Sequence, residues 1–349
     1  MFACLLTLFI LGLIGCGSNS MKIKVIPSFY YWKTSLAFDA ADYEFFKSIS
    51  LKKMYVRFFD VLWDEKYRTT VPSNVLTVKK GTVWVEKVVP VIFITPKAIQ
   101  MTATPKESDA LAKNIIQIVS EISKRTGCPR ITELQVDCDW IPQTRHNYFQ
   151  LLDKLKLRVS KAFPGATLTC TIRLHQIKYV SATGVPPVDS GVLMIYHTSS
   201  PKVFKNENSI LDVGEAKKYL AHFSEYPLPL DIALPVFSWG IQFNSEHKFI
   251  RVLEGANRKT LESNPDLKRT QKNIFAATQR TIVSENRVLQ GDFVKLDEAD
   301  IEACREMLGY IKDHARKSPI TLSLFHYDLS LVRQFSGGND EKFSLLFNQ

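Results

Sequence analysis

The chain has 349 residues, with 45 lysines and arginines against 35 aspartates and glutamates, a net charge of +10 at pH 7 and a pI near 9.2. A chain this long can form one large domain or two smaller ones. The basic residues are scattered, with mild clusters at Lys202–Lys205 and Arg258–Lys272, and no nucleic-acid recognition motif accompanies them. We therefore predict no nucleic-acid partner, and the charge indicates either a solvated surface or contact with anionic lipid or an anionic envelope polymer.

The first residues have the pattern of a secretory leader. Residues 1–15 carry no charge and include the apolar run from Leu5 to Ile14, which is too short to span a membrane. The ending Leu13-Ile14-Gly15-Cys16 resembles the bacterial lipobox, whose cysteine is lipidated after cleavage. The resemblance implies a signal peptide at 1–15, a lipidated Cys16 with a spacer at 16–22, and a lipoprotein of the bacterial cell envelope.

Two features of this leader leave alternatives open. No acidic cluster follows Cys16, so we expect a protein that faces the periplasm and is held at a membrane by acyl chains such as palmitate. No lysine or arginine precedes the apolar run, so the natural start could lie upstream of Met1. The alternative is a start at Met21 and a cytosolic protein.

Strand-like and helix-like segments alternate along the rest of the chain. Strands are predicted at Ile23–Tyr31, Lys53–Val61, Val88–Ile94, Ile131–Asp139, Ala166–Leu174, Gly191–His197, Asp231–Ser238 and Ile320–Tyr327. Helices are predicted at Ala40–Ser50, Ser108–Arg125, Arg145–Phe163, Gly214–Glu225 and Glu298–Arg316. This alternation predicts an α/β fold, a single (β/α)8 barrel of the TIM type over residues 23–349.

Two stretches depart from the alternation. Residues 64–87 contain two turn signals between β-rich pieces and look like a hairpin. Residues 240–297 are long for a connection and contain another hairpin-like piece around Gln290. We predict long loops after strands 2 and 7, at the rim of the barrel where active-site walls are commonly built.

The fourth and fifth strands carry polar residues on one face. Alternation places Glu133, Gln135, Asp137 and Asp139 together, and likewise Thr169, Thr171, Arg173 and His175. Burying a lone carboxylate is costly, so these faces must meet a cavity, a ligand or a counter-ion. In such barrels the chemistry lies at the carboxyl ends of the strands, which we call the mouth.

The mouth supplies the candidate site residues. Asp137 and Asp139 lie about 6–7 Å apart along a strand, and two carboxylates this close raise each other's pKa unless Arg57 or Arg173 intervenes. A raised carboxyl pKa suits a general acid, so both are candidate catalytic residues, the alternative being a structural arginine–aspartate network. Flat aromatic rings and polar groups that suit sugar binding follow the same strands. The candidate substrate-binding residues are Trp32, Arg57, Asp60, Trp140, Arg173, His175, Tyr196, His197 and Trp239.

We predict no metal and no other cofactor. Histidines follow several strands, but no Glu-x-x-His or His-x-His spacing supports a divalent site. The cysteines lack a Cys-x-x-Cys spacing. Cys138 and Cys170 fall on the apolar faces of their strands and are interpreted as small buried hydrophobes, with a disulfide left open.

The segment Gln135-Val-Asp-Cys-Asp-Trp-Ile141 resembles the fourth-strand motif Gly-Ile-Asp-Leu-Asp-Trp-Glu of family 18 glycoside hydrolases, the chitinase group. Met194-Ile-Tyr-His197 resembles their sixth-strand Met-x-Tyr-Asp. These enzymes are α/β barrels that cleave N-acetylhexosamine polymers with help from the substrate's acetamido group. The resemblance implies that Asp137 and Asp139 orient and charge-balance this group and that Tyr196 hydrogen-bonds to it.

The motif departs from the family at two positions. Ile141 stands where the family has its proton-donating glutamate, and His197 stands where it has an aspartate. Three functions remain open: a glycoside hydrolase in which Asp139 acts as the acid with Asp137 or Asp60 as partner, a non-catalytic glycan-binding lipoprotein, and an envelope scaffold lipoprotein. The expected partners are a glycan or oligosaccharide and a membrane, and the sequence does not define the oligomeric state.

Overall fold

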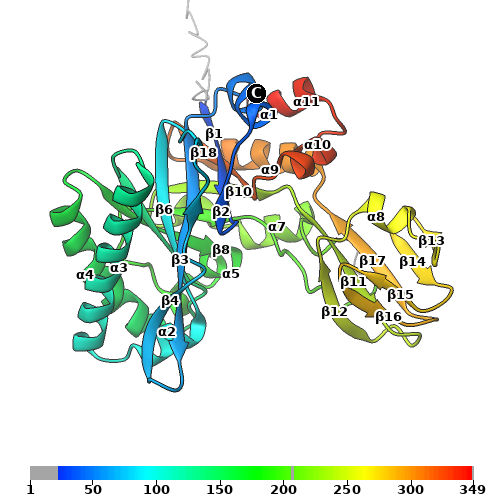
Figure 1. Cartoon of the computed structure of the whole chain (residues 1–349), viewed down its shortest axis with the longest axis horizontal. Coiled ribbons are helices and arrows are strands. Elements are labelled where there is room, and N and C mark those ends of the chain that lie inside the picture. The colour runs from blue at the N-terminus through cyan, green and yellow to red at the C-terminus, as the bar shows by residue number, and fades with distance from the viewer. Residues whose placement is uncertain (1–22, 206–207, 348–349) are drawn as a thin grey trace, which may run out of the picture.

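The computed structural model of the protein describes residues 23–205 and 208–347 (Figure 1). The predicted signal peptide, Cys16 and the spacer through residue 22 lie outside the described residues. Eight parallel strands form a closed barrel, because β1 pairs with both β3 and β18. In order around the barrel they are β1 (Val25–Tyr31), β3 (Lys53–Asp64), β6 (Lys87–Ile94), β7 (Glu133–Asp137), β8 (Thr167–Arg173), β9 (Ser190–Met194), β10 (Leu230–Pro235) and β18 (Ile320–Phe325). The predicted TIM-type barrel is confirmed.

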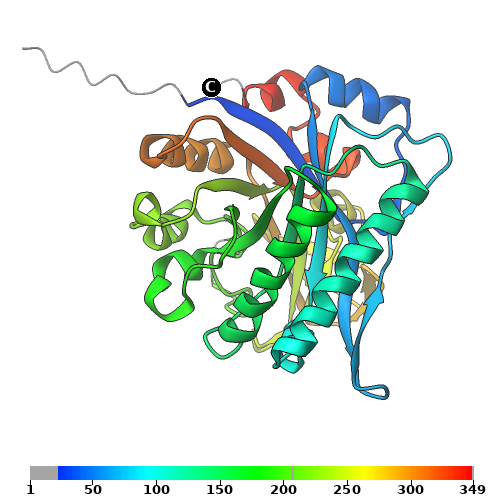
Figure 2. The same ribbon diagram turned by 90° about the vertical axis from the view of Figure 1, so that its left-hand side faces the viewer.

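Helices cover the outside of the barrel. They are α1 (Ala40–Ser48), α2 (Pro96–Met101), α3 (Pro105–Thr126), α4 (Arg145–Ala162), α5 (Leu174–Lys178), α6 (Val180–Thr183), α7 (Val213–Tyr219), the 3-10 turn η1 (Phe223–Glu225), α9 (Ile301–His314), α10 (Leu329–Phe335) and α11 (Asp340–Ser344). Figure 2 shows α3 and α4 running side by side over the strands. Within the described part of the chain, no helix has the length and apolar character needed to cross a membrane.

Local signals in the sequence define the ends of the longest helix, α3. The Thr104 hydroxyl accepts a hydrogen bond from the backbone N–H of Glu107, and the Glu107 carboxylate accepts one from the backbone N–H of Thr104. Pro105 occupies the first turn, where its missing N–H costs nothing. Gly127 ends the helix in the left-handed conformation, with φ of 63°. This agrees with the predicted helix end.

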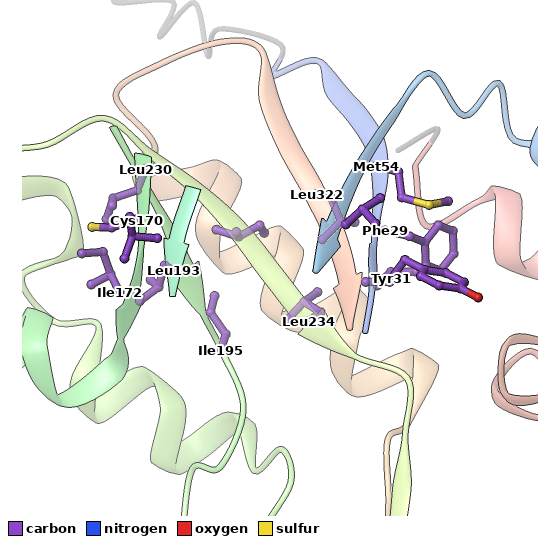
Figure 3. Close-up of a cluster of buried hydrophobic side chains, with 14 of the residues drawn as sticks. Phe29, Tyr31, Met54, Cys170, Ile172, Leu193, Ile195, Leu230, Leu234 and Leu322 are labelled. Atoms are coloured by element: carbon purple, nitrogen blue, oxygen red, sulfur yellow. The ribbon is translucent and has the colours of Figure 1, made fainter. Parts of the chain in front are cut away.

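The core lies between the barrel and its helices. Along each strand, alternate side chains point outward and pack against the helices, as Figure 3 shows for Phe29, Met54, Cys170, Leu193 and Leu322. All five are fully buried, and a side chain of this kind and of leucine size contributes about 1.5–3 kcal/mol by leaving water. The intervening side chains point into the barrel, which is how the polar face of β7 and β8 comes to line the interior.

The two irregular stretches are both β-structure. The first contains β4 (Thr69–Ser73), which extends β3 as an antiparallel partner, and the short β5 (Thr77–Val78), which pairs with β2 (Ser35–Leu36). This fits the predicted hairpin, which projects from the carboxyl end of the barrel in Figure 1.

The stretch after β10 is more ordered than a loop. It forms a five-stranded antiparallel sheet in the order β12 (Phe249–Glu254), β11 (Ser238–Phe243), β17 (Phe293–Glu298), β14 (Ile274–Ala277) and β13 (Leu267–Gln271). A hairpin of β15 (Thr281–Val283) and β16 (Asn286–Val288) and the helix α8 (Arg258–Glu262) complete it. The sheet, which we call the insertion, has its own cluster of buried apolar side chains and lies to one side of the barrel in Figure 1.

Candidate functional site

An aspartate–arginine–aspartate cluster lies at the carboxyl ends of β7 and β8. Asp137 is the last residue of β7, and Arg173 is the last residue of β8. The Nε atom of Arg173 donates a hydrogen bond of 2.5 Å to Asp139, and its Nη2 atom lies 3.6 Å from Asp137. Arg173 therefore lies against both carboxylates, as the spacing of polar residues on the two strands predicted.

The two carboxylates of this cluster meet different surroundings. The side chain of Asp137 is 6% exposed and accepts a hydrogen bond of 2.6 Å from the Thr171 hydroxyl, whereas the side chain of Asp139 is 48% exposed. Burial raises the pKa of Asp137, Arg173 opposes this shift, and Asp139 adds to it. Burial alone would lower the pKa of Arg173, but Asp137, Tyr196 and Asp139 together outweigh this effect, and the pKa of Arg173 is raised. Arg173 therefore stays charged, and Asp137 holds a proton more readily than an ordinary aspartate does.

Three aromatic rings stand beside this cluster. Tyr196 and His197 follow β9, and the Arg173 guanidinium lies 6.0 Å from the centre of the Tyr196 ring. The His197 ring stacks on Trp239 of the insertion at 5.0 Å, with 15° between the ring planes. The insertion thus brings a flat ring to the mouth, beside the residues that the fourth, fifth and sixth barrel strands supply.

The same crowding changes the acid–base properties of these rings. Burial raises the pKa of the Tyr196 hydroxyl, although Arg173 opposes this, so Tyr196 keeps its proton and can donate a hydrogen bond. The rings around His197 exclude part of its water and lower its pKa to about 4, and Arg173 adds to this effect. His197 still has an edge open to solvent. It is therefore neutral near pH 7.

A second ion pair lies on β3. Arg57 and Asp60 are three residues apart, which would place them on opposite faces of a regular strand. A bulge between Arg57 and Phe59, seen in the register with β6, brings both to the same face, where Arg57 donates two hydrogen bonds to Asp60. Asn74 donates another to Asp60 at 2.7 Å, and the Arg57 guanidinium lies 5.4 Å from the Trp32 ring. Asp60 is therefore fully engaged and 2% exposed.

One predicted site residue is not at the mouth. Trp140 is completely buried, stacks on Tyr148 of α4 at 5.1 Å and donates a hydrogen bond to the carbonyl of Thr183. The prediction that it contacts substrate is not supported by this placement, because it follows β7 on the side that faces the helices. His175 lies in α5, two residues after Arg173, and is exposed. The part of its ring that is covered lowers its pKa by loss of water, and Asp139 opposes this shift.

Sequence reasoning missed several residues that shape the mouth. Phe325 at the end of β18 lies 5.5 Å from both the Trp32 and the Tyr196 rings, and Phe237 lies 5.5 Å from Trp239. The position of Phe325 and Phe237 at strand ends was the available signal. Thr171 was visible on the polar face of its strand but was not singled out.

Buried polar contacts connect the insertion to the mouth, and no local sequence pattern predicts them. Asp297 of β17 accepts hydrogen bonds from both the backbone and the hydroxyl of Ser209 and lies 3.2 Å from Lys295. The Trp239 indole donates a hydrogen bond of 3.3 Å to the same hydroxyl. Ser209 and Asp297 are 88 residues apart in the sequence, and this distance hides the pair from sequence analysis.

The described residues give no metal centre. No group of three or more histidine, cysteine, aspartate or glutamate side chains within them is arranged to hold an ion. The four cysteines in the described ranges, Cys128, Cys138, Cys170 and Cys304, are free thiols.

Comparison with known proteins gives a clear result only for the fold. No protein-family model matches the sequence, and no curated protein matches it either. Solved structures do match. The spore cortex-lytic enzyme SleL of Bacillus cereus superposes with a TM-score of 0.54 at 13% identity, covering 93% of this chain and 74% of that one. The Group IV chitinase of Ostrinia furnacalis gives 0.53 at 11% identity, covering 93% and 99%. A class V chitinase mutant of Cycas revoluta in complex with (GlcNAc)3 gives 0.54 at 12% identity, covering 92% and 99%.

The fold is that of the family 18 chitinases. Within this family 18 fold, the two segments that resemble the family's motifs both lie at the mouth: Asp137 ends β7, and Tyr196 follows β9. Ile141, which the sequence resemblance aligns with the family's glutamate, is 48% exposed.

Proposed function

We propose that the protein binds a glycan containing N-acetylhexosamine units at the barrel mouth, and that it does so without cleaving the glycan. The observation that carries this proposal is the pairing of Arg173 with Asp139 at 2.5 Å, in a motif whose proton-donor position holds Ile141. An isoleucine has no proton to give. Arg173 already holds the Asp139 carboxylate through a charged hydrogen bond, which suits Asp139 to positioning Arg173 better than to replacing the missing acid.

The remaining mouth groups suit binding. The stacked rings of His197 and Trp239 offer a flat apolar surface of the kind that packs against the C–H face of a sugar ring. The Tyr196 hydroxyl keeps its proton and donates to Met194 Sδ at 3.2 Å, so it can donate to an acetamido oxygen in place of that contact. Asp139 and Arg173 can exchange hydrogen bonds with hydroxyl groups. Support for this ligand class comes from the neighbours in fold, among them a chitinase in complex with (GlcNAc)3.

Hydrolysis is the second candidate, because Asp137 is a carboxyl group whose pKa burial raises. A carboxyl group that holds its proton near neutral pH is what a glycosidase needs as general acid. Against this role, the Asp137 side chain is 6% exposed and its Oδ1 already accepts a hydrogen bond from Thr171. These contacts suit a group that organises the site better than one that reaches a glycosidic oxygen.

The anchored location belongs to the same proposal. The lipobox-like ending at Cys16 supports a lipoprotein of the bacterial envelope that presents its barrel to envelope, dietary or host glycans. Labelling of growing cells with palmitate, followed by purification of the protein, is expected to label the wild type and not Cys16→Ser. Label that persists in this variant would contradict the anchor and leave the glycan proposal untouched.

Turnover is tested by reducing-end release. Wild type, Asp139→Asn and Asp137→Asn would be incubated with chitin oligomers, peptidoglycan fragments and common plant and host glycans. We expect no release by any of them. Release by the wild type that disappears in Asp137→Asn would favour hydrolysis with Asp137 as acid, and release lost only in Asp139→Asn would return that role to Asp139.

A further inference from the structure

A basic cavity lies at the end of the barrel opposite the mouth. Its volume is about 590 Å³, and its lining includes four lysines, Lys24, Lys52, Lys53 and Lys87, but a single carboxylate, Glu133. These lysines stand at the starts of three neighbouring strands: Lys24 precedes β1, Lys52 precedes β3, Lys53 opens β3 and Lys87 opens β6. The barrel thus gathers at its amino end charges that look scattered in the sequence.

Backbone contacts hold these lysines close together. The backbone N–H of Lys87 donates to the carbonyl of Lys52 at 2.8 Å, and Lys53 pairs with Lys87 in the register of β3 and β6. The carbonyl of Lys24 accepts a hydrogen bond from Ile320 at the start of β18. The backbone of each of these lysines is therefore held by the barrel itself rather than by a loop.

Among the described residues, only part of this charge is neutralised. Lys53 is mostly buried and pairs with Glu133 at 2.7 Å. Lys52 is 68% exposed and reaches Glu86 only at 3.7 Å, a surface pair of little energetic weight. Lys24 and Lys87 are exposed as well. The cavity therefore presents a surplus of positive charge to solvent, which suits an anionic ligand.

The covering helices add positive charge at the same end. In a TIM barrel the helices run antiparallel to the strands, so their last turns lie at the amino end. Basic side chains occupy these turns, and they are Lys47 in α1, Lys124 and Arg125 in α3, Lys161 in α4, Lys217 and Lys218 in α7, and Lys312 and His314 in α9. Basic side chains of the helices therefore lie at the same end as the basic cavity, although some of them pair with nearby carboxylates.

The chain itself brings this face near the proposed anchor. Lys24 follows Cys16 by eight residues in the sequence, and a fully extended chain of that length spans at most about 29 Å. In Figure 1 β1 begins at the same end of the barrel as α11, away from the hairpin that marks the carboxyl end. A lipidated Cys16 would therefore hold the amino end of the barrel, and not its mouth, within reach of the bilayer.

We propose that the basic cavity and the lysines at its edge bind the phosphate groups of anionic phospholipids at the membrane surface. This contact would dock the barrel with its amino end on the bilayer and its mouth directed away from it. The proposal deepens the anchoring part of the proposed function, but the charge-dependent contact is measurable whether or not Cys16 is lipidated.

The test compares binding of the full chain to phosphatidylcholine vesicles and to mixed phosphatidylcholine–phosphatidylglycerol vesicles. Acyl chains contribute equally in both, so the difference isolates the contribution of charge. A lysine near an anionic surface strengthens binding by about fivefold, so the variant Lys24→Gln/Lys52→Gln/Lys87→Gln is expected to lose on the order of 100-fold on the mixed vesicles and nothing on the neutral ones. The preference for mixed vesicles should fall as salt is added.

A matched control separates this face from net charge. Lys66→Gln/Lys106→Gln/Lys268→Gln removes three exposed lysines from the β3–β4 turn, the first turn of α3 and the insertion. This variant is expected to keep the wild-type preference for mixed vesicles. Equal losses in the two variants, or a wild type that does not distinguish the vesicles, would overturn the proposal.

A protection experiment with inorganic phosphate separates a lipid headgroup from a free anion. Protection of Lys24, Lys52 and Lys87 from an amine-acylating reagent by mixed vesicles, but not by phosphate alone, is the expected result. Protection by phosphate without any preference for mixed vesicles would assign the cavity to a soluble anion and reject the membrane contact. Failure to bind neutral vesicles, with the charge-dependent binding retained, would count against the anchor at Cys16 and not against the lysines.

Discussion

Replacing Arg173 by glutamine tests the account of the mouth through its main cation. Arg173 Nη2 lies 3.6 Å from Asp137, and the Coulomb attraction at this distance is about 4 to 5 kcal/mol at an effective dielectric constant of about 20. Removing one partner of a mostly buried pair costs about 3–5 kcal/mol, because the other charge stays buried. The contact of Arg173 with Asp139 contributes little to the free energy of unfolding, because that carboxylate is half exposed. We therefore expect Arg173→Gln to lower the free energy of unfolding by about 3 kcal/mol at pH 8.

The stability loss caused by Arg173→Gln should depend on pH. Arg173 lowers the pKa of Asp137 in the wild type, so its loss must raise that pKa further. A carboxyl group with a raised folded-state pKa binds protons more tightly than the unfolded chain does, and stability is lost as the pH rises from the ordinary aspartate range through the folded-state pKa. The cost of Arg173→Gln should therefore be smaller at pH 4, where protonated Asp137 carries no uncompensated charge.

Urea unfolding at the two pH values measures both effects. The matched control is the double variant Arg173→Gln/Asp137→Asn, in which no buried charge is left without its partner. It should recover a large part of the stability that Arg173→Gln loses at pH 8. A loss that is equal at pH 4 and pH 8, with no recovery in the double variant, would refute the assigned role of Arg173.

Three further variants examine single contacts. Trp140→Phe removes the hydrogen bond to the Thr183 carbonyl and should lower the free energy of unfolding by about 1–2 kcal/mol. Glycan binding, measured by titration, should not change, and altered binding would contradict the placement of Trp140 away from the mouth. The pKa of His197 is lowered from 6.5 to about 4, so its unfolded form binds the proton more tightly and stability is lost as the pH falls through this window. His197→Gln should therefore flatten part of the melting-temperature profile between pH 6.5 and 4, and an unchanged profile would count against the shift. Asp297→Asn breaks a buried ion pair with Lys295 and should lower the free energy of unfolding by about 3–5 kcal/mol. Asp297 also holds Ser209, which accepts a hydrogen bond from the Trp239 indole, so this variant should weaken glycan binding as well. Unchanged glycan binding would show that the role of Asp297 is purely structural.

The sequence was sufficient for the barrel because its signals are local. The alternation in Glu133 to Trp140 identified which side chains of β7 enter the barrel, and the approach of Arg173 to Asp137 and Asp139 followed from the same parity on β8. The same argument, applied strictly, places Trp140 on the helix side, where the structure has it. Proposing it for substrate binding gave more weight to residue type than to parity.

The parts that sequence reasoning missed depend on contacts between distant segments. The bulge that brings Arg57 and Asp60 to one face is visible only in the register between β3 and β6. The insertion looked like a loop because its strands are short and pair antiparallel across long separations, as β11 does with β17. The link from Asp297 to Ser209 joins two segments with no shared motif. The basic cavity likewise arises from lysines that are separate in the sequence and adjacent only in the barrel.

The most direct test of the central claim is an equilibrium titration of the protein with N-acetylglucosamine oligomers, followed by tryptophan fluorescence. The variant is Trp239→Ala, and the control is Trp84→Ala, a part-buried tryptophan that donates a hydrogen bond to Thr126 at the end of α3. The account predicts saturable binding by the wild type and by Trp84→Ala, and binding at least tenfold weaker, by about 1.4 kcal/mol, for Trp239→Ala. Absence of binding by the wild type to chitin oligomers and to peptidoglycan fragments alike would contradict a glycan site at the mouth and favour the scaffold alternative.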